Sequence, residues 1–472
     1  MNWEPVIGLE IHVQLKTQTK MFCRCRLEFG AEPNTHTCPV CLGHPGSLPV
    51  PNAMAIEWTI KLGLALGCEI AERALFHRKN YFYRDLPKGY QISQYDVPMC
   101  GEGRFVLPGP DGDSEIGIVR AHLEEDAAKS VHVGGAGGRS VRAAYSLVDF
   151  NRGGTPLVEI VTKPDIRSAD EAKRFLQLLR QTVIELGISD AEMEKGTLRA
   201  DANVSVRKAD EGAYRTRTEL KNMNSFTFIA RGIDAEIARQ IELYEAGGQV
   251  VQETYDYDPD TNALTPHRAK EEADDYRYFP EPDLVPVEPP PEVVERLRGE
   301  LPELPGVRIR RFESQYSLPY YDAEVLNGSS RLAALFEGVV AAGAEAKAAS
   351  NVLMNQFAAA GVDAATVDAA ELAKLIEARE RIPRAAFTEA LAASGKPGFS
   401  ADRYLSDGLV ADVSELEPLV ERILEANEEQ VAAYRSGKEG LLGFFVGQVM
   451  RETQGKADPK VVNELLRAKL KT

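Results

Sequence analysis

Apolar and polar side chains alternate along residues 8–15, near the N-terminus, and this pattern predicts a β-strand. Successive side chains of a strand point to opposite faces, so Leu9 and Ile11 share an aliphatic face while Glu10 and His12 share a polar one. A half-buried antiparallel strand with a solvated polar face would explain the pattern. Alternatively, Glu10 and His12 bind a metal ion or move a proton, because a strand would fix them side by side.

Later segments with strand character repeat this arrangement. Asp201 lies on the polar face of one segment, and Glu219 shares a face with Lys221 in another. Asp, Asn, Glu and His on such faces are more typical of the lining of a site than of a solvated sheet, which favours Lys and Thr. The segments run over residues 115–133, 139–151, 156–165, 198–207 and 216–226. We therefore expect a mixed or largely antiparallel sheet whose polar face is lined with carboxylates.

Glu124 and Glu125 are expected to close the first strand of the segment that begins at residue 115. Adjacent strand residues normally face opposite sides, which would leave one of the two carboxylates pointing away from the polar face. A bulge or a strand end would let both converge. The Gly-rich residues 134–138 are interpreted as a hairpin tip, since both flanks favour strands and no Lys-Ser/Thr pair follows.

Helical spacing is predicted over residues 52–66, 169–186 and 228–247. Ser168 and Glu171 have the spacing of a capping box at the start of the second of these helices. Prolines then crowd residues 280–291, which predicts a stiff linker, and the chain becomes rich in Ala, Leu and Glu with helical spacing. The predicted division is a sheet domain over residues 1–292, a helical domain over 293–405 and a small helical tail domain over 406–472.

The chain of 472 residues carries a formal net charge of −17, which argues against a protein that coats nucleic acid through general electrostatics. No apolar run approaches the ~20 residues needed to span a bilayer. The start of the chain does not resemble a signal peptide, and we expect a cytoplasmic protein without a membrane partner. From Gly443 onward, however, six basic and three acidic side chains reverse the sign of the charge. This tail is either an RNA-contacting surface or only a solvated face, and its candidate contact residues are Lys456, Lys460, Arg467 and Lys469.

Four of the six cysteines form a cluster in the sequence. Cys23 and Cys25 make a CxC pair, and after twelve intervening residues Cys38 and Cys41 make a CxxC pair followed by a turn glycine. In a large cytosolic chain this spacing favours a structural zinc site with four thiolates over disulfides. Four reduced core thiols are the alternative, and a neighbouring histidine could replace one sulfur.

Residues 77–96 interleave basic and aromatic side chains, among them Lys79, Tyr81 and Lys88. Bases stack on aromatic rings while cations meet phosphates, so this segment could bind a nucleotide or the end of a single-stranded RNA. An ordered tyrosine-rich loop packed on the core is the alternative interpretation.

Taken together, these segments resemble one family, the B subunit of the tRNA-dependent amidotransferase (GatB). The resemblance spans essentially the whole chain and rests on long motifs in the same order: GLEIHVQL, CPVCLGHPGSLPVPN, RKNYFY, LPKGYQISQYD, HLEEDA, LRADANVSVR, KNMNSF, DYRYFPEPDL and GFFVGQVM. Arg84 departs from the family pattern, which has proline at that place, and this bears on local rigidity only.

The resemblance implies an α+β fold in which a sheet-based cradle domain with a zinc knuckle precedes a helical domain and a small helical tail domain. It implies a heterotrimer with an amidase A subunit, which frees ammonia from glutamine, and a small C subunit. The implied substrates are Glu-tRNA(Gln), Asp-tRNA(Asn) or both, with ATP, Mg²⁺ and a structural Zn²⁺. Mapped onto this sequence, Glu10, His12 and Glu125 are the expected Mg²⁺ ligands. The other expected active-site residues are Glu124, Lys79, Asp201 and Glu219.

The ATP-dependent step follows from chemistry, because ammonia cannot displace an oxygen of a carboxylate until phosphorylation supplies a leaving group. The carboxylate lining is therefore expected to organise the metal and the triphosphate, and His12 is expected to be a ligand or a proton acceptor. The rival interpretation is a scaffold without catalytic activity that binds tRNA through its zinc knuckle and tail. The scaffold would explain the cysteines and the basic tail but not the carboxylate-lined strands.

Overall fold

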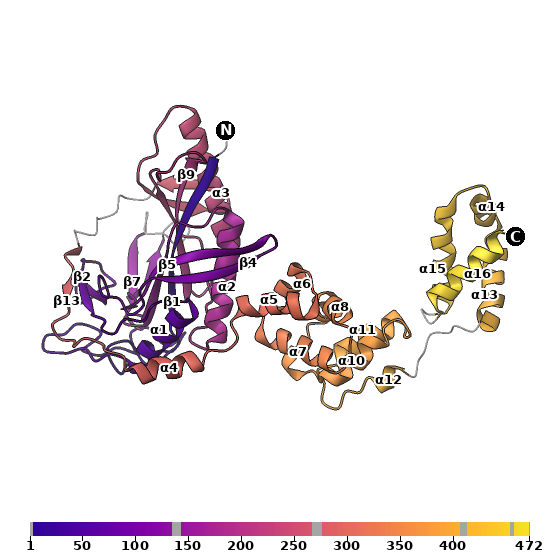
Figure 1. Cartoon of the computed structure of the whole chain (residues 1–472), viewed down its shortest axis with the longest axis horizontal. Helices are drawn as coiled ribbons and strands as arrows, with labels where there is room; N and C mark the ends of the chain where they lie inside the picture. Colours follow the sequence, from indigo (N-terminus) through magenta and orange to yellow (C-terminus); the bar gives the residue numbers. More distant parts are fainter. Residues whose placement is uncertain (1–2, 135–142, 267–275, 406–412, 454–456, 472) are drawn as a thin grey trace. The chain divides into compact units, whose positions relative to one another are not determined.

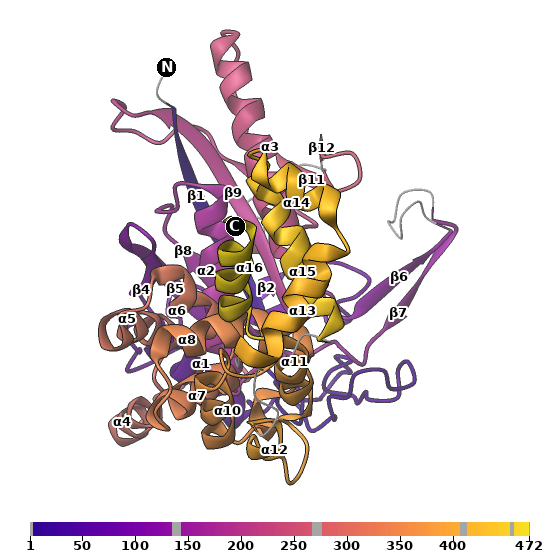
Figure 2. The same ribbon diagram turned by 90° about the vertical axis from the view of Figure 1, so that its right-hand side faces the viewer.

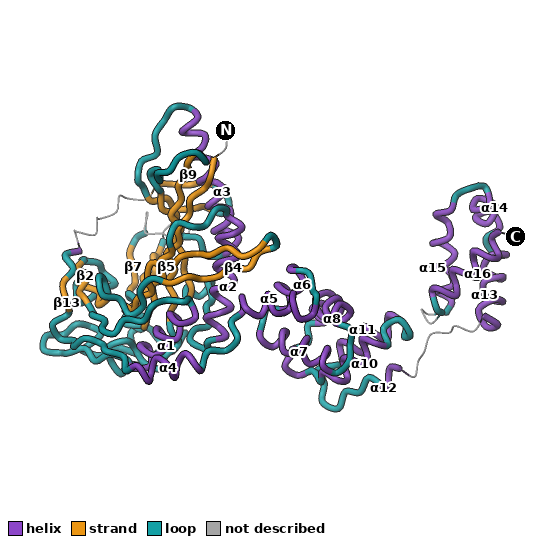
Figure 3. The backbone as a smooth tube through the Cα atoms, in the orientation of Figure 1, coloured by secondary structure: helices purple, strands orange, loops and turns teal. Residues whose placement is uncertain are grey.

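The computed structural model describes residues 3–134, 143–266, 276–405, 413–453 and 457–471. The chain divides into two compact units, Met1–Val307 and Arg308–Thr472, which are described separately below. Every described strand lies in the first unit, and the second unit is helical (Figure 3). The predicted combination of a sheet domain with helical C-terminal parts is therefore confirmed. No helix in the described ranges is long and apolar enough to cross a membrane.

The first unit contains thirteen described strands and four described helices (Figure 1). The strands are β1 (Trp3–Gln14), β2 (His77–Asn80), β3 (Tyr90–Ser93), β4 (Gly103–Gly109), β5 (Gly112–Glu125), β6 (Lys129–Val133), β7 (Tyr145–Asp149), β8 (Pro156–Thr162), β9 (Leu198–Lys208), β10 (Thr218–Lys221), β11 (Thr254–Asp258), β12 (Ala263–Pro266) and β13 (Phe279–Pro280). The helices are α1 (Ala53–Ala65), α2 (Ala169–Glu185), α3 (Phe226–Glu245) and α4 (Pro291–Gly299).

Strand β1 lies inside the large sheet, whose order is β12-β11-β10-β9-β1-β8-β5-β4. It pairs antiparallel with β9 on one side and β8 on the other. Leu9, Ile11 and Val13 are buried, which confirms the predicted strand and its aliphatic face. Cross-strand partners project to the same side of a sheet, so the polar face of β1 is extended by residues of β8 and β9. Of the described strand pairs in this sheet, β10–β11 is parallel and the rest are antiparallel.

Strands β6 and β7 form a separate two-stranded sheet (Figure 2). Strand β5 ends at Glu125, which confirms the prediction that Glu124 and Glu125 close the first strand of this region, and the backbone then leaves the large sheet. The amide of Asp126 donates to the carbonyl of Thr155, and the amide of Ala128 donates to the carbonyl of Asp85. The antiparallel pairing agrees with the predicted hairpin, although most of its glycine-rich tip lies outside the described residues.

The helix starts have the capping that their sequences predict. Asn52 accepts hydrogen bonds from the first turn of α1, and Ser168 accepts one from the amide of Glu171 at the start of α2. In a capping box the Glu171 carboxylate would accept a hydrogen bond from the backbone amide of Ser168. Here it accepts one from the amide of the preceding residue, Arg167. Helices α2 and α3 pack on each other beside the large sheet (Figure 1).

The proline-rich stretch before α4 is packed on the first unit, so its interpretation as a linker is wrong. Glu281 is buried and accepts two hydrogen bonds of 2.7 Å from the guanidinium of Arg78. Val287 forms a bridge with Ala74. Pro291 opens α4, a position at which proline is tolerated because its missing amide has no partner in a helix start.

The second unit consists of short helices. They are α5 (Pro305–Tyr316), which begins in the first unit, α6 (Tyr320–Leu326), α7 (Ser330–Ala341), α8 (Ala346–Asn351), a π-helical turn (Val352–Phe357), α9 (Ala358–Ala360), α10 (Ala369–Glu377), α11 (Arg384–Ala393), α12 (Asp402–Leu405), α13 (Val413–Glu425), α14 (Glu428–Arg435), α15 (Leu442–Glu452) and α16 (Pro459–Lys471). Helices α13, α15 and α16 share a small apolar core of their own that includes Leu416, Phe445 and Leu466. The separate tail domain stays a prediction that this core supports.

Candidate functional site

A cleft of about 1050 Å³ opens over the polar face of the large sheet. It is lined by side chains of β1, β5, β8 and β9 and by the loops that follow β10 and precede β13. The charged residues among them are Glu10, His12, Lys79, Glu124, Asp126, Lys129, Glu159, Glu194, Lys195, Arg199, Asp201 and Lys221. The predicted carboxylate-lined polar face is therefore the wall of a cleft and not a solvated surface.

His12 lies at the centre of a row of charged side chains that crosses four strands. Its register partners are Glu159 on β8 and Arg199 on β9, and Glu159 in turn pairs with His122 on β5. The Nε2 atom of His12 is 3.5 Å from Oε2 of Glu159 and 3.9 Å from Oε1 of Glu10. Strand pairing thus brings together residues that are more than a hundred positions apart in the sequence.

A second group of side chains shares Glu159 with this row. Nε2 of the buried His122 is 3.6 Å from a carboxylate oxygen of Glu124 and 3.6 Å from Oε2 of Glu159. Glu124 also accepts a 2.9 Å hydrogen bond from the hydroxyl of Ser93, and its other oxygen is 4.0 Å from His12. Two donor groups with one shared carboxylate therefore lie side by side in the cleft.

Burial and neighbouring charge shift the protonation of this cluster in different directions. Burial, followed by the Glu159 carboxylate, raises the pKa of Glu10. Burial alone would raise the pKa of Glu159, but His122 and His12 outweigh it and hold that pKa far below its usual range. Burial alone would lower the pKa of His12, but the carboxylates of Glu159 and Glu124 raise it overall. Such opposed shifts are typical of functional sites.

Of the remaining predicted active-site residues, Lys79 and Asp201 line the cleft, and Glu219 is buried beside it on β10. Lys79 stands over the ring of Tyr276, with Nζ 4.8 Å from the ring centre, and Glu124 helps to raise its pKa against the effect of burial. Asp201 is the register partner of Glu10 and is paired with Lys221. Glu219 lies 3.4 Å from the same Lys221 ammonium, so this lysine bridges the two carboxylates.

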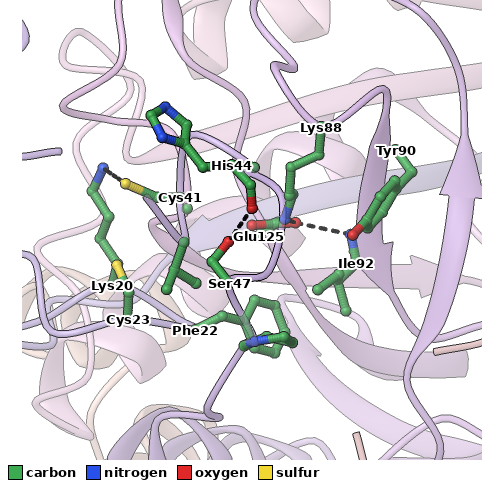
Figure 4. Close-up of a pocket in the computed structure, with 14 residues that line it drawn as sticks. Lys20, Phe22, Cys23, Cys41, His44, Ser47, Lys88, Tyr90, Ile92 and Glu125 are labelled. Carbon is green, nitrogen blue, oxygen red and sulfur yellow. Dashed lines mark hydrogen bonds and ion pairs between the residues drawn. The ribbon is translucent and has the colours of Figure 1, made fainter. Parts of the chain in front are cut away.

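The carboxylate of Glu125 points away from the cleft that holds Glu10, His12 and Glu124. It is paired with the ammonium of Lys88 and accepts a 3.0 Å hydrogen bond from the amide of Ile92. It lines a separate cavity of about 80 Å³ (Figure 4). The alternation of strand side chains therefore holds at Glu124 and Glu125, and the described backbone has no bulge that makes them converge.

The residues of the cleft fit a divalent cation. Glu10, His12 and Glu159 each offer a ligand atom, and these atoms lie within 4.8 Å of one another. Neighbouring ligands of an octahedral Mg²⁺ lie roughly 3 Å apart and opposite ones about 4 Å, so small side-chain movements would close the site. Two carboxylates suit Mg²⁺, while the imidazole is more usual for Mn²⁺. The ligand atoms of a second group, His122, Glu124 and Glu159, also lie within 4.8 Å of one another.

The four clustered cysteines also converge, since all four sulfur atoms lie within 4.8 Å of one another. The sulfur atoms of Cys38 and Cys41 are 3.9 Å apart, close to the ~3.8 Å edge of a tetrahedron with Zn–S bonds of about 2.3 Å. A hydrogen bond from the Cys23 thiol lowers the pKa of Cys41 to about 4, and burial raises the pKa of Cys25 to about 11. The cluster could therefore bind a structural metal.

Sequence reasoning missed two residues of the cleft, Glu159 and His122, as members of the site. His122 and Glu124 are two positions apart on β5 and so share a face, and this signal was present in the sequence. Glu159 had no such signal, because its role depends on which strand pairs with β1.

The candidate RNA-contacting residues of the tail have different surroundings. Lys460 and Arg467 are exposed on α16, and Lys460 forms an exposed ion pair of 3.1 Å with Glu380. Lys469 is paired with Glu417 and Glu421 of α13. Lys456 lies outside the described residues.

Comparisons with known proteins agree with this architecture. The family model described as "GatB/GatE catalytic domain" matches residues 5–295, and the one described as "GatB domain" matches residues 334–470. A protein from Geobacter sulfurreducens, named as the B subunit of aspartyl/glutamyl-tRNA(Asn/Gln) amidotransferase, is 50% identical over the full length of both chains. Proteins of the same name from Geobacter sp. strain M21 and Persephonella marina are 48% and 46% identical, again over both full lengths. The chain therefore belongs to the GatB family of amidotransferase B subunits, as its motifs predicted.

Proposed function

We propose that this chain is the B subunit of a glutamine-dependent enzyme that converts Glu-tRNA(Gln), Asp-tRNA(Asn) or both into Gln-tRNA(Gln) and Asn-tRNA(Asn). The observation that carries the proposal is the Glu10–His12–Glu159 group inside the cleft. The name shared by the full-length relatives supports these substrates. In the assembled cytoplasmic enzyme, an amidase A subunit frees ammonia from glutamine and a small C subunit joins the two.

The chemistry explains why the cleft needs buried charge. The side-chain carboxylate of the misacylated amino acid is a poor electrophile until it accepts the γ-phosphoryl group of ATP and becomes an acyl phosphate. Ammonia then attacks the carbonyl carbon and phosphate leaves. One proton must also leave the attacking nitrogen, and a nearby base accepts it. Phosphoryl transfer depends mostly on positioning and charge neutralisation.

The proposed roles follow from the placement of the side chains. Glu10, His12 and Glu159 hold the cation, which supplies charge neutralisation to the triphosphate. Lys79, which reaches the same cleft, binds a phosphate oxygen or the substrate carboxylate. Glu124 is held by Ser93 and His122 and orients the histidines. Asp201 and Glu219 fix Lys221 at the wall of the cleft.

The roles of His12 and Glu125 need separate comment. His12 is proposed as a ligand first and as a proton acceptor in the amidation step second. Glu125 was expected to be a third ligand through the family resemblance. With its carboxylate on Lys88, it would have to change rotamer and break that ion pair to reach the cation.

The other modules supply structure and substrate affinity. A zinc ion on Cys23, Cys25, Cys38 and Cys41 stabilises the loops between β1 and α1. The tail contributes affinity for tRNA through Lys460 and Arg467, and Lys456 is included on its sequence alone. A scaffold without catalytic activity is disfavoured by the buried cluster of opposed charges, which a binding platform does not need.

The proposal is tested with the assembled complex carrying Glu10→Gln or Glu159→Gln. Each change should lower both aminoacyl-tRNA-dependent ATP hydrolysis and amide formation by ~10²-fold or more, the loss typical of removing a charge-stabilising group. Glutamine hydrolysis belongs to the partner amidase and should continue at its uncoupled rate. Near wild-type amidation by either variant would contradict the proposal.

Glu115→Gln is the matched control. Glu115 lies on β5, the strand that carries Glu124, but its side chain is exposed and pairs with Arg104 at the surface. This variant should retain all three activities. Equal losses of activity in Glu115→Gln and Glu10→Gln would mean that the assay detects a general loss of folded protein and not an effect on the cleft.

A further inference from the structure

Lys20 lies in the loop that follows β1, and its side chain is only 1% exposed. Its ammonium donates a 2.9 Å hydrogen bond to the carbonyl of Phe150. The same ammonium lies 3.6 Å from the sulfur of Cys41 (Figure 4). Within the described residues, no carboxylate forms an ion pair with it. A buried ammonium is costly unless an opposite charge compensates it, and the neighbouring group that can carry such a charge is the Cys41 sulfur.

The cysteine cluster with zinc bound would carry an excess of negative charge. Four thiolates around a divalent zinc ion leave about two negative charges in excess. Outer groups that donate hydrogen bonds to metal ligands offset such charge and orient the ligands. Cys41 already accepts a 3.2 Å hydrogen bond from the amide of Cys38, and Lys20 adds a donor that carries a full positive charge.

Lys20 also connects the two halves of the cluster. Its backbone amide donates to the carbonyl of Cys25, in the CxC half, while its side chain reaches Cys41, in the CxxC half. The space for the side chain depends on Gly154, which has a φ of +87°, and where a Cβ atom would lie 3.3 Å from Cδ of Lys20. The ammonium is therefore held in place by the fold and does not sample solvent as a surface lysine would.

We propose that Lys20 is a positioning residue of the metal centre, which compensates the charge of the zinc thiolates and slows the release of zinc. This inference rests on the zinc site proposed above. It does not depend on the amidation chemistry, so its readout is metal binding in the full-length chain.

The experiment measures the rate at which a chromophoric chelator removes zinc from the full-length chain, with wild type compared with Lys20→Met and Lys20→Arg. Loss of a group that supports metal ligands typically costs ~10–100-fold in affinity. Lys20→Met should therefore release zinc at least about tenfold faster, and Lys20→Arg, which keeps the charge, should stay closer to wild type.

Arg26→Met is the matched control. Arg26 is also basic and adjacent to a cysteine in sequence, but its side chain is exposed and lies 3.5 Å from Glu28. This variant should release zinc at the wild-type rate. If Arg26→Met and Lys20→Met accelerated release equally, net charge and not the buried contact would be responsible, and the proposal would be wrong.

Measuring the zinc content of the wild-type chain separates the possible failures. A wild-type chain that contains no zinc refutes the zinc site itself. A zinc-containing chain whose release rate is unchanged in Lys20→Met refutes only the role of Lys20. If Lys20→Met does not fold, Lys20→Gln keeps a polar side chain without the charge and should show the same acceleration. The last test compares the free energy of unfolding of wild type and Lys20→Met, each with and without zinc. A purely structural role of Lys20 would lower this free energy equally in the metal-free and the zinc-loaded protein, whereas the proposed role predicts a larger loss in the zinc-loaded protein.

Discussion

Oε2 of Glu159 lies 3.5 Å from Nε2 of His12 and 3.6 Å from Nε2 of His122. One carboxylate oxygen is thus held between imidazoles that belong to the two strands flanking β8. Because each of the three side chains stands on a paired strand, the group needs little rearrangement to meet a ligand. Such preorganisation is what makes electrostatic stabilisation effective in an active site.

Replacing His12 with alanine should distinguish its two proposed roles. If His12 is mainly a metal ligand, ATP hydrolysis and amidation fall together, and excess Mg²⁺ or Mn²⁺ partly restores both. If it is mainly the proton acceptor, phosphoryl transfer continues and the acyl phosphate is lost to water, so ADP forms without amide. We expect the first result, because Glu10 and Glu159 offer carboxylate ligands on the same face as His12. Parallel assays of ADP and amide in the assembled complex provide the measurement.

Cys38→Ser should act on stability and not on catalysis. Removing a thiolate from a closed four-ligand site lowers metal affinity, and metal affinity contributes to folding. We expect about one zinc per wild-type chain, less in the variant, and a larger loss of soluble protein than of activity per folded molecule. A metal-free wild-type chain of full stability would exclude a structural zinc.

Truncation after Leu405 should weaken tRNA binding and leave the chemistry in place. The apparent KM for aminoacyl-tRNA should rise, and the salt dependence of binding should become shallower because fewer cations meet phosphates. Glutamine hydrolysis by the complex should survive. An unchanged KM would mean that Lys460 and Arg467 belong only to a solvated face.

Lys88→Met should destabilise the first unit. The Lys88 and Glu125 side chains are both nearly buried, and the variant leaves the Glu125 carboxylate without its cation. Breaking one side of a buried ion pair typically costs about 3–5 kcal/mol, which should appear in the free energy of unfolding in urea. Lys163→Met is the control, since Lys163 pairs with Glu102 at the surface and should contribute less than about 1 kcal/mol.

The pH dependence of stability can be tested at Asp322, a buried residue of α6. Burial alone would raise its pKa, but Lys347 and the hydroxyl of Ser350 outweigh it and lower the pKa of Asp322. A lowered folded-state pKa gives stability that is present above the unfolded pKa of about 3.9 and is lost as the pH falls through the folded value. Asp322→Asn should therefore be less stable than wild type at pH 7, by about 1–3 kcal/mol.

This difference in unfolding free energy should shrink as the pH is lowered below about 4. Asp363→Asn is a suitable control, because Asp363 pairs with Arg331 across an exposed surface. A difference between Asp322→Asn and wild type that stays constant from about pH 7 to about pH 3 would contradict the argument.

The features that could be predicted from the sequence are the local ones. Alternation in β1 predicted which side chains are buried, and the caps at Asn52 and Ser168 predicted where helices begin. These signals depend on neighbours within a few residues. The convergence of the four cysteines was also predictable, because their spacing is typical of metal sites.

The composition of the donor group could not be predicted in the same way. Glu159 joins His12 only because β8 pairs with β1 in one particular register, and a shift of one residue would turn it to the other face. Glu125 was expected in the cleft through the family resemblance, although strand alternation alone favoured the opposite side. The proline-rich stretch was misread because composition does not reveal the buried contact between Arg78 and Glu281.

The place of β1 inside the sheet also imposes an order of events during synthesis. This strand precedes the other described strands in the sequence, yet one neighbour begins at Pro156 and the other at Leu198. At the usual 5–20 residues per second, the roughly 140 residues between β1 and β8 take on the order of ten seconds or more. For that time the aliphatic residues of β1 have neither partner strand, and Glu10 and His12 cannot meet Glu159. A nascent chain released before Pro156 therefore exposes an unpaired apolar strand and lacks the donor group. Early translational arrest should produce aggregation or degradation and no partially active fragment.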